Sequence, residues 1–101
     1  MKTKLEKNET YLKGEWIEKN DEVVGDETCN RIRSLITNFE EISSTSGGWE
    51  ILYRDSSDGR YWELFYEHSD WHGGGPPSLR NISELEAKER EASQKMTMIV
   101  Q

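Results

Sequence analysis

Apolar and polar positions alternate most clearly in two aromatic segments near the middle of the chain. Residues 49–54 and 60–67 are rich in Trp, Tyr and Phe, and the second segment carries aromatic side chains on both of its faces. Between them, the Asp58-Gly59 pair suits a tight reversal. The pattern predicts an antiparallel hairpin whose second strand lies centrally in a sheet.

A spacing of three and four residues predicts a helix before this hairpin. Asp26 can accept hydrogen bonds from the free amides of a first helical turn, and Glu27 adds favourable charge there. Apolar residues then form one stripe: Cys29, Ile32, Leu35, Ile36, Phe39 and Ile42. We expect a helix over residues 27–42, packed on one face of the sheet and ended by the small and β-branched residues 43–48.

Shorter elements flank these two. Residues 11–18 alternate as a short strand with Trp16 pointing inward, and residues 19–22 form a turn before a second short strand at 23–24. This is an opening hairpin. Residues 1–10 are polar and form an irregular lead-in.

The C-terminal part begins with a short strand at residues 79–82. Ser83 and Glu86 form a capping box for a charged helix, in which Leu85 is the only large apolar side chain. This helix is therefore expected on the surface. Residues 96–100 form an apolar end.

Together these elements predict a single α+β domain, with an antiparallel sheet of about four strands, one main helix on a face and a C-terminal helix. A chain of 101 residues closes one core. We expect an N-terminal tail over 1–10, the domain over 11–95 and a C-terminal tail over 96–101.

Charge narrows the class of partner. The formal net charge is −7, and residues 14–70 carry fourteen acidic and five basic residues, a net charge of −9. Phosphate backbones repel such a surface, so direct nucleic-acid binding is disfavoured and a basic protein partner is favoured, although acidity also serves solubility. No apolar run suits a membrane span or a secretory signal, which indicates a cytoplasmic protein.

Metal and redox chemistry find little support in the sequence. Cys29 is the single cysteine and cannot form an internal disulfide or a zinc clamp. His68 and His72 are four residues apart with Asp70 between them, a spacing that holds metal on a helix, but the following glycines disfavour a helix here. Metal binding through these histidines stays a minor alternative, and we expect no cofactor.

The HGGG sequence at His72 is also found in the oxyanion-hole loop of lipases and esterases. The chain has no G-x-S-x-G nucleophile elbow and is too short for that fold, so this interpretation is rejected. We interpret the segment as a structural loop that ends the sheet, because glycines abandon side-chain packing and prolines remove amide donors. It comprises His72, Gly73, Gly74, Gly75, Pro76 and Pro77.

Three strand carboxylates, Glu50, Glu63 and Glu67, are candidates for general acid or base, but nothing pairs them with a nucleophile. Glu63 has Arg54 and Arg60 nearby in sequence. A structural ion pair or hydrogen bond is therefore the favoured interpretation for Glu63, and no catalytic residue is assigned.

Five segments, read together, resemble one family. They are G-E-W at 14–16, D-E-T-C at 26–29, G-W-E-x-L-Y-R-D at 48–55, D-G-R-Y-W-E-L at 58–64 and H-G-G-G-P-P at 72–77. In this order they resemble the immunity protein 27 family of bacterial polymorphic-toxin systems, over about residues 11–88. The chain departs from the family pattern at Glu67, where the family has proline.

The resemblance implies a cytoplasmic protein without enzymatic activity that binds the C-terminal domain of a toxin from a contact-dependent or polymorphic system. Because a cleft that grips nucleic acid is basic, an acidic inhibitor can occupy it, so a nuclease toxin is the leading expectation. The alternative is an adaptor for another cytosolic protein. The expected contacts are acidic or aromatic side chains at strand ends: Asp55, Asp58, Glu67, Asp70 and Trp71.

Overall fold

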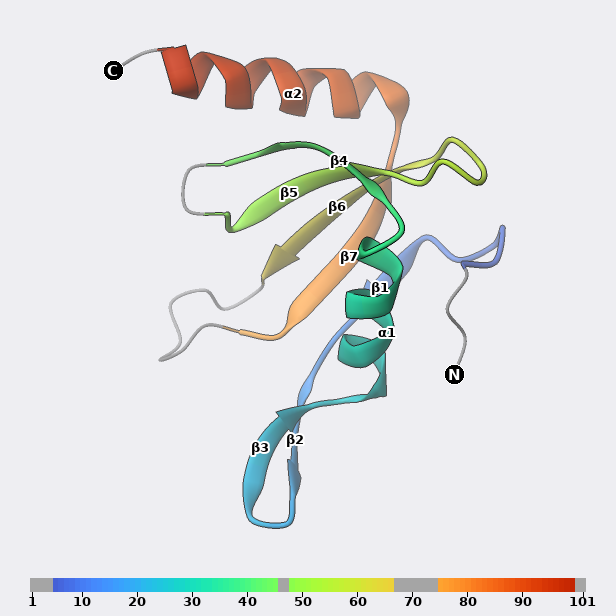
Figure 1. Ribbon diagram of the computed structural model, residues 1–101, viewed down its shortest axis with the longest axis vertical. Helices are drawn as coiled ribbons and strands as arrows, with labels where there is room; N and C mark the ends of the chain where they lie inside the picture. The colour runs from blue at the N-terminus through green and yellow to red at the C-terminus, as the bar shows by residue number, and fades with distance from the viewer. Residues whose placement is uncertain (1–4, 46–47, 67–74, 100–101) are drawn as a thin grey trace.

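The computed structural model describes residues 5–45, 48–66 and 75–99, with side chains as far as Gln94. These residues form seven strands and two helices, in the order β1 (Tyr11–Lys13), β2 (Trp16–Lys19), β3 (Glu22–Gly25), α1 (Glu27–Ile36), β4 (Glu40–Ser44), β5 (Glu50–Arg54), β6 (Tyr61–Tyr66), β7 (Pro77–Ile82) and α2 (Glu84–Ile99). The fold is α+β, as predicted. Five strands form one antiparallel sheet in the order β1-β7-β6-β5-β4, while β2 and β3 form a separate hairpin (Figure 1).

The expected opening hairpin is present, because β2 pairs with β3, but the prediction of one continuous strand over residues 11–18 was wrong. Residues 11–18 split at Gly14, so that β1 pairs with β7 in the main sheet and β2 pairs with β3 outside it. The Gly14 amide donates to the Pro77 carbonyl oxygen at 2.9 Å, and a Cβ at Gly14 would lie 2.3 Å from that oxygen. Only glycine allows so close an approach, which places the branch point between sheet and hairpin here.

The beginning of α1 follows the prediction, but its end does not. The Asp26 carboxylate accepts a hydrogen bond from the Cys29 amide at 2.9 Å, as an N-cap should. The helix ends at Ile36, and Glu40–Ser44 forms β4 at the sheet edge, paired with β5. The apolar spacing continued past Ile36, but hydrogen bonding to β5 outweighs weak helical propensity in this segment.

Each face of the sheet has its own core. Buried side chains from α1 and the sheet form the larger one: Leu12, Ile32, Leu35, Tyr53, Trp62, Leu64 and Leu79. A smaller cluster of Leu52, Ile82 and Ala87 lies on the opposite face, where α2 packs over β4 and β5. The two-sided burial of β6 confirms that it is a central strand.

A buried carboxylate fixes α2 to the sheet. The Glu63 side chain is 1% exposed, and its Oε2 accepts from Nε of Arg90 on α2 at 2.8 Å. Its Oε1 accepts from Nε of Arg80 on β7 at 2.8 Å, and the same guanidinium lies 4.7 Å from the centre of the Phe65 ring. The predicted ion pair of Glu63 is therefore confirmed, although its partners come from β7 and α2 and not from Arg54 or Arg60.

At the start of α2, the capping box is present, because the Glu86 amide donates to Ser83 Oγ at 3.1 Å and the Ser83 amide donates to Glu86 Oε1 at 3.3 Å. Leu85 is 67% exposed, in line with a surface helix. The helix runs on to Ile99, so the backbone from residue 96 to that point is helical where a tail was expected. Likewise, Pro77 opens β7 and does not belong to the loop.

Candidate interaction surface

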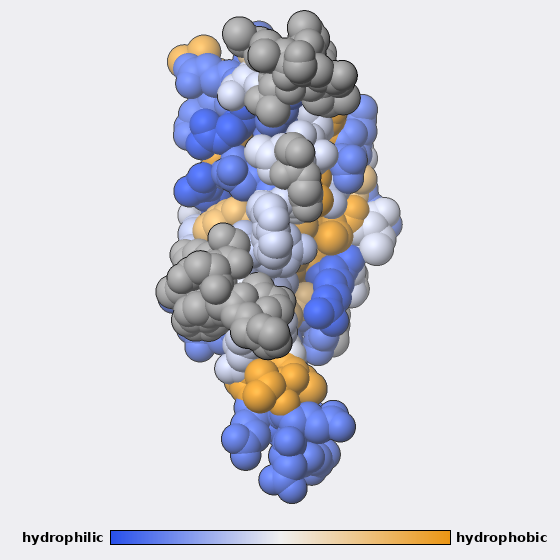
Figure 2. All heavy atoms as spheres, turned by 90° about the vertical axis from the view of Figure 1, so that its left-hand side faces the viewer, coloured by the Kyte–Doolittle hydropathy of each residue, from blue (hydrophilic) through white to orange (hydrophobic). Residues whose placement is uncertain are grey.

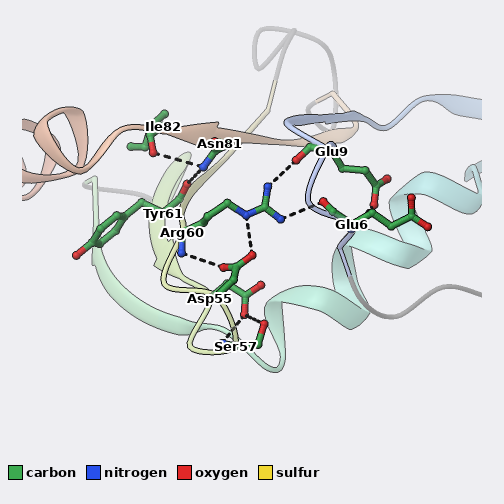
Figure 3. Close-up of polar contacts among 9 residues, drawn as sticks. Glu6, Glu9, Asp55, Ser57, Arg60, Tyr61, Asn81 and Ile82 are labelled. Atoms are coloured by element: carbon green, nitrogen blue, oxygen red, sulfur yellow. Dashed lines mark hydrogen bonds and ion pairs between the residues drawn. The ribbon is translucent and has the colours of Figure 1, made fainter.

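The loop between β5 and β6 uses one predicted contact residue for its own structure. Asp55 is 8% exposed, and its Oδ1 accepts from the Ser57 amide at 2.9 Å and from Ser57 Oγ at 2.7 Å. Figure 3 shows this carboxylate turned toward the loop. Asp55 therefore shapes the loop that presents its neighbours, and its role as a partner contact stays a prediction.

Asp58 is exposed but is held by Arg60. Its Oδ2 accepts from Arg60 Nε at 2.7 Å and its Oδ1 accepts from the Arg60 amide at 2.9 Å. Partial burial acts to raise the pKa of Asp58, but the backbone and side-chain hydrogen bonds from Arg60 and its charge outweigh burial, so the pKa lies below its ordinary value. Asp58 is thus a fixed, ionised group at this end of the sheet.

The same arginine fastens the N-terminal segment. Its guanidinium donates to the carbonyl oxygens of Glu9 at 2.8 Å and Glu6 at 3.1 Å, and these contacts are visible in Figure 3. The Glu9 carboxylate forms two hydrogen bonds with Arg31 of α1, at 2.6 and 2.7 Å. Residues 5–10 form the irregular lead-in that was predicted, and they are bound to both the sheet and α1.

The structure describes only the last three residues of the HGGGPP segment. Glu67, His68, Asp70, Trp71, His72, Gly73 and Gly74 lie outside the described residues, while Gly75, Pro76 and Pro77 are buried. Within the described ranges, no group of three or more His, Cys, Asp or Glu residues is arranged to hold a metal ion. The expectations for the acidic and aromatic contacts in this loop therefore stay predictions.

An aromatic hollow of about 180 Å³ opens on the α1 side of the sheet. Trp16, Ile36, Trp49, Tyr66 and Pro77 contribute to its lining. Trp49 is half exposed and meets the Tyr66 ring edge-on, with 5.7 Å between ring centres. This volume is below the roughly 300 Å³ of small-molecule sites, so the hollow suits a partner's side chain better than a cofactor.

The β2–β3 hairpin, here called the acidic arm (residues 15–27 including its base), was not among the predicted contacts. These residues include six acidic and one basic residue, a net charge of −5 out of −7 for the whole chain. Glu15, Glu18, Asp21, Glu22 and Glu27 are exposed. Figure 2 shows the arm as a hydrophilic projection with apolar surface beside it.

The match to known proteins decides the family. The profile of the family described as Immunity protein 27 matches residues 18–83, well over half of the chain. The chain belongs to this family. No curated protein and no solved structure matches it. The resemblance to this family is thereby confirmed: four of the five segments lie in the matched range, and the segment at 14–16 precedes it. The matched range also includes most of the acidic arm.

Membership in the immunity protein 27 family makes this chain an immunity protein, which acts by binding a cognate toxin. In the part of the chain that the structure describes, no helix is long and apolar enough to cross a membrane.

The acidic arm was not predicted from the sequence, because the net charge was counted over the much longer range 14–70. The signal that could have found it is the density of acidic residues around the Asn20-Asp21 turn.

Proposed function

We propose that this immunity protein neutralises a nuclease domain of a contact-dependent or polymorphic toxin in the cytoplasm by covering the basic cleft that binds nucleic acid. The observation that supports this most strongly is that four arginines of the body are paired with carboxylates, whereas carboxylates of the acidic arm are exposed. A nuclease cleft must attract phosphate and is therefore rich in Lys and Arg. An acidic protein surface is complementary to it.

Several cationic side chains of the body are paired within the molecule. Four arginines are engaged by carboxylates: Arg31 by Glu9, Arg60 by Asp58, and Arg80 and Arg90 by Glu63. By contrast, across residues 5–45, 48–66 and 75–94, no ion pair or side-chain hydrogen bond involves Glu18, Asp21 or Glu22. The unneutralised charge of the surface is therefore negative, which favours rapid association with a basic domain.

The proposed surface has an acidic and an aromatic part. The predicted contacts Asp55 and Asp58 lie in the β5–β6 loop, where their carboxylates are bonded to Ser57 and Arg60. The predicted contacts Glu67, Asp70 and Trp71 belong to the segment that follows β6. The hollow beside Trp49 offers a site for an inserted side chain. Aromatic anchors would slow dissociation after charge has accelerated the encounter.

Copurification and a nuclease assay test this function. We expect the chain to copurify with the toxin domain encoded beside it and to stop that domain from cleaving RNA or DNA at a 1:1 ratio. Bovine serum albumin, which is also acidic, serves as a control for non-specific charge. A complex that forms while cleavage continues, or a domain that damages cells without cleaving nucleic acid, would contradict the nuclease mechanism.

A further inference from the structure

We infer that the acidic arm is the element that enters the basic cleft of the toxin domain. This inference rests on the proposed function and specifies which surface performs it. The arm consists of the two-stranded sheet β2–β3, which projects away from the five-stranded sheet, and of its base at Glu15, Asp26 and Glu27 (Figure 1). The sheet and its turn carry a net charge of −2, and the base adds three further carboxylates. The two strands hold four residues each, so the sheet reaches roughly 13 Å at about 3.3 Å per residue.

Apolar side chains on the arm are exposed without a partner in the body. Val23 is 70% exposed and Ile17 is 44% exposed. Ile17 pairs with Val24 and Glu18 pairs with Val23, so the two exposed apolar side chains lie on opposite faces of the ribbon. A ribbon with apolar groups on both faces and carboxylates around its tip is suited to a cleft that contacts it from two sides.

The tip of the arm is defined by its turn. Asn20 and Asp21 both adopt left-handed backbone conformations, with φ of 54° and 65°, between the paired residues Lys19 and Glu22. Two central residues with positive φ are typical of a type I′ turn, which matches the twist of a hairpin. The Asp21 carboxylate is therefore placed at the extreme end of a regular ribbon.

The base of the arm is closed by tight contacts. The Asp26 amide donates to the Glu15 carbonyl oxygen at 2.9 Å. Cys29 is fully buried, and Cβ atoms built at Gly14 and Gly25 would lie 2.6 Å from its Sγ and 2.8 Å from its Cβ. Backbone therefore packs against the side chain of α1 on both sides of the base. This holds the arm in one direction and lowers the entropy lost on binding.

The net charge of the arm indicates which partner it binds. A net charge of −5 over residues 15–27 repels nucleic acid and repels the same arm of a second copy. It attracts a cleft rich in Lys and Arg, where Glu18, Asp21 and Glu22 would take the place of phosphates. The partner that fits the arm is consequently the basic cleft of the toxin domain, in preference to a second copy of this chain.

A charge-matched pair of variants tests the inference against a catalytically inactive toxin domain at one salt concentration. The arm variant combines Glu18→Lys, Asp21→Asn and Glu22→Gln, in which Asn keeps the turn conformation. The control combines Glu89→Lys, Glu40→Gln and Glu41→Gln, which change the charge equally at exposed sites on α2 and β4. We expect about 100-fold weaker binding for the arm variant and less than about threefold for the control.

A second pair removes apolar surface without changing charge. Val23→Ser on the arm should weaken binding about tenfold, while Leu85→Ser, at a similarly exposed residue of α2, should leave it unchanged. This pair decides the question if the charge variant fails to fold, since substitutions at exposed sites alter stability by only about 0.5 kcal/mol.

The outcomes distinguish a wrong assignment of the binding surface from a wrong function. If the wild-type chain binds and protects but both arm variants keep wild-type affinity, or lose no more than their controls, the inference is overturned and the function stands. If the wild-type chain does not bind the domain, the function itself fails. If light scattering shows a wild-type dimer that the arm variant dissociates, the arm binds a second copy and the inference is again overturned.

Discussion

Two hairpins of this molecule, β5–β6 and β2–β3, use their acidic residues in opposite ways. In the loop of β5–β6, Asp55 accepts hydrogen bonds from Ser57, and Asp58 accepts them from Arg60. At the tip of β2–β3, Asp21 and the flanking carboxylates point to solvent. The first set of carboxylates stabilises the fold, whereas the second is available to a partner.

The two hairpins also differ in the exposure of their apolar side chains. Leu52, Tyr53, Trp62 and Leu64 of β5–β6 are buried on the two faces of the main sheet. Ile17 and Val23 of β2–β3 remain exposed, although isolated two-stranded hairpins are marginally stable in water. Substitutions in β5–β6 should therefore change stability, and substitutions at the tip of β2–β3 should change affinity.

The largest effect is expected for Glu63→Ala in β6. The change leaves the guanidinium groups of Arg80 and Arg90 without their carboxylate, and breaking such a buried pair costs about 3 kcal/mol. Their side chains are 39% and 34% exposed, so water offsets part of the loss and the cost should not exceed this value. Urea denaturation would measure the free energy of unfolding.

Glu40→Ala is the control, since Glu40 is exposed on β4 and no ion pair in the described residues involves it. It should cost less than about 1 kcal/mol. Toxin affinity of the folded Glu63→Ala protein should stay within about threefold of wild type, because Glu63 is buried. A large loss of affinity with unchanged stability would contradict the proposal that β5–β6 stabilises the fold and β2–β3 binds the toxin.

A smaller effect is expected for Gly14→Ala at the base of the arm. The added methyl group would lie 2.3 Å from the Pro77 oxygen and 2.6 Å from Cys29 Sγ, so backbone must move. Overpacking of this kind costs about 2 kcal/mol. Because the arm would shift, toxin affinity should fall along with the melting temperature.

Gly48→Ala is the comparison for Gly14→Ala. No atom lies within 4 Å of a Cβ at Gly48, so only its positive φ of 75° should contribute, at about 1 kcal/mol. Equal affinity of the Gly14→Ala protein and the wild type would show that the direction of the arm does not matter for binding.

Local signals in the sequence were sufficient for much of the fold. The Asp26 cap, the capping box at Ser83 and the aromatic hairpin depend on neighbouring residues and were predicted. The end of α1 was missed because β4 forms only by pairing with β5. The local sequence pattern around Ile36 does not show this pairing. The branch at Gly14 was missed because it arises from contact with Pro77, 63 residues later.

The candidate surface was harder to predict than the fold. Charge indicated an acidic face, but a sequence does not show which carboxylates are already bonded. Asp55 and Asp58 looked like free contacts and are held by Ser57 and Arg60. The exposure of Val23 followed only from the separation of β2–β3 from the main sheet.

The most direct test of electrostatic inhibition is the association rate of the wild-type chain with the inactive toxin domain as salt is raised from 50 to 500 mM. We expect the rate constant to fall at least about tenfold, because screening weakens attraction between exposed charges, while the dissociation rate changes little. The arm variant should show a flatter dependence. A wild-type association rate that does not vary with salt would contradict the account.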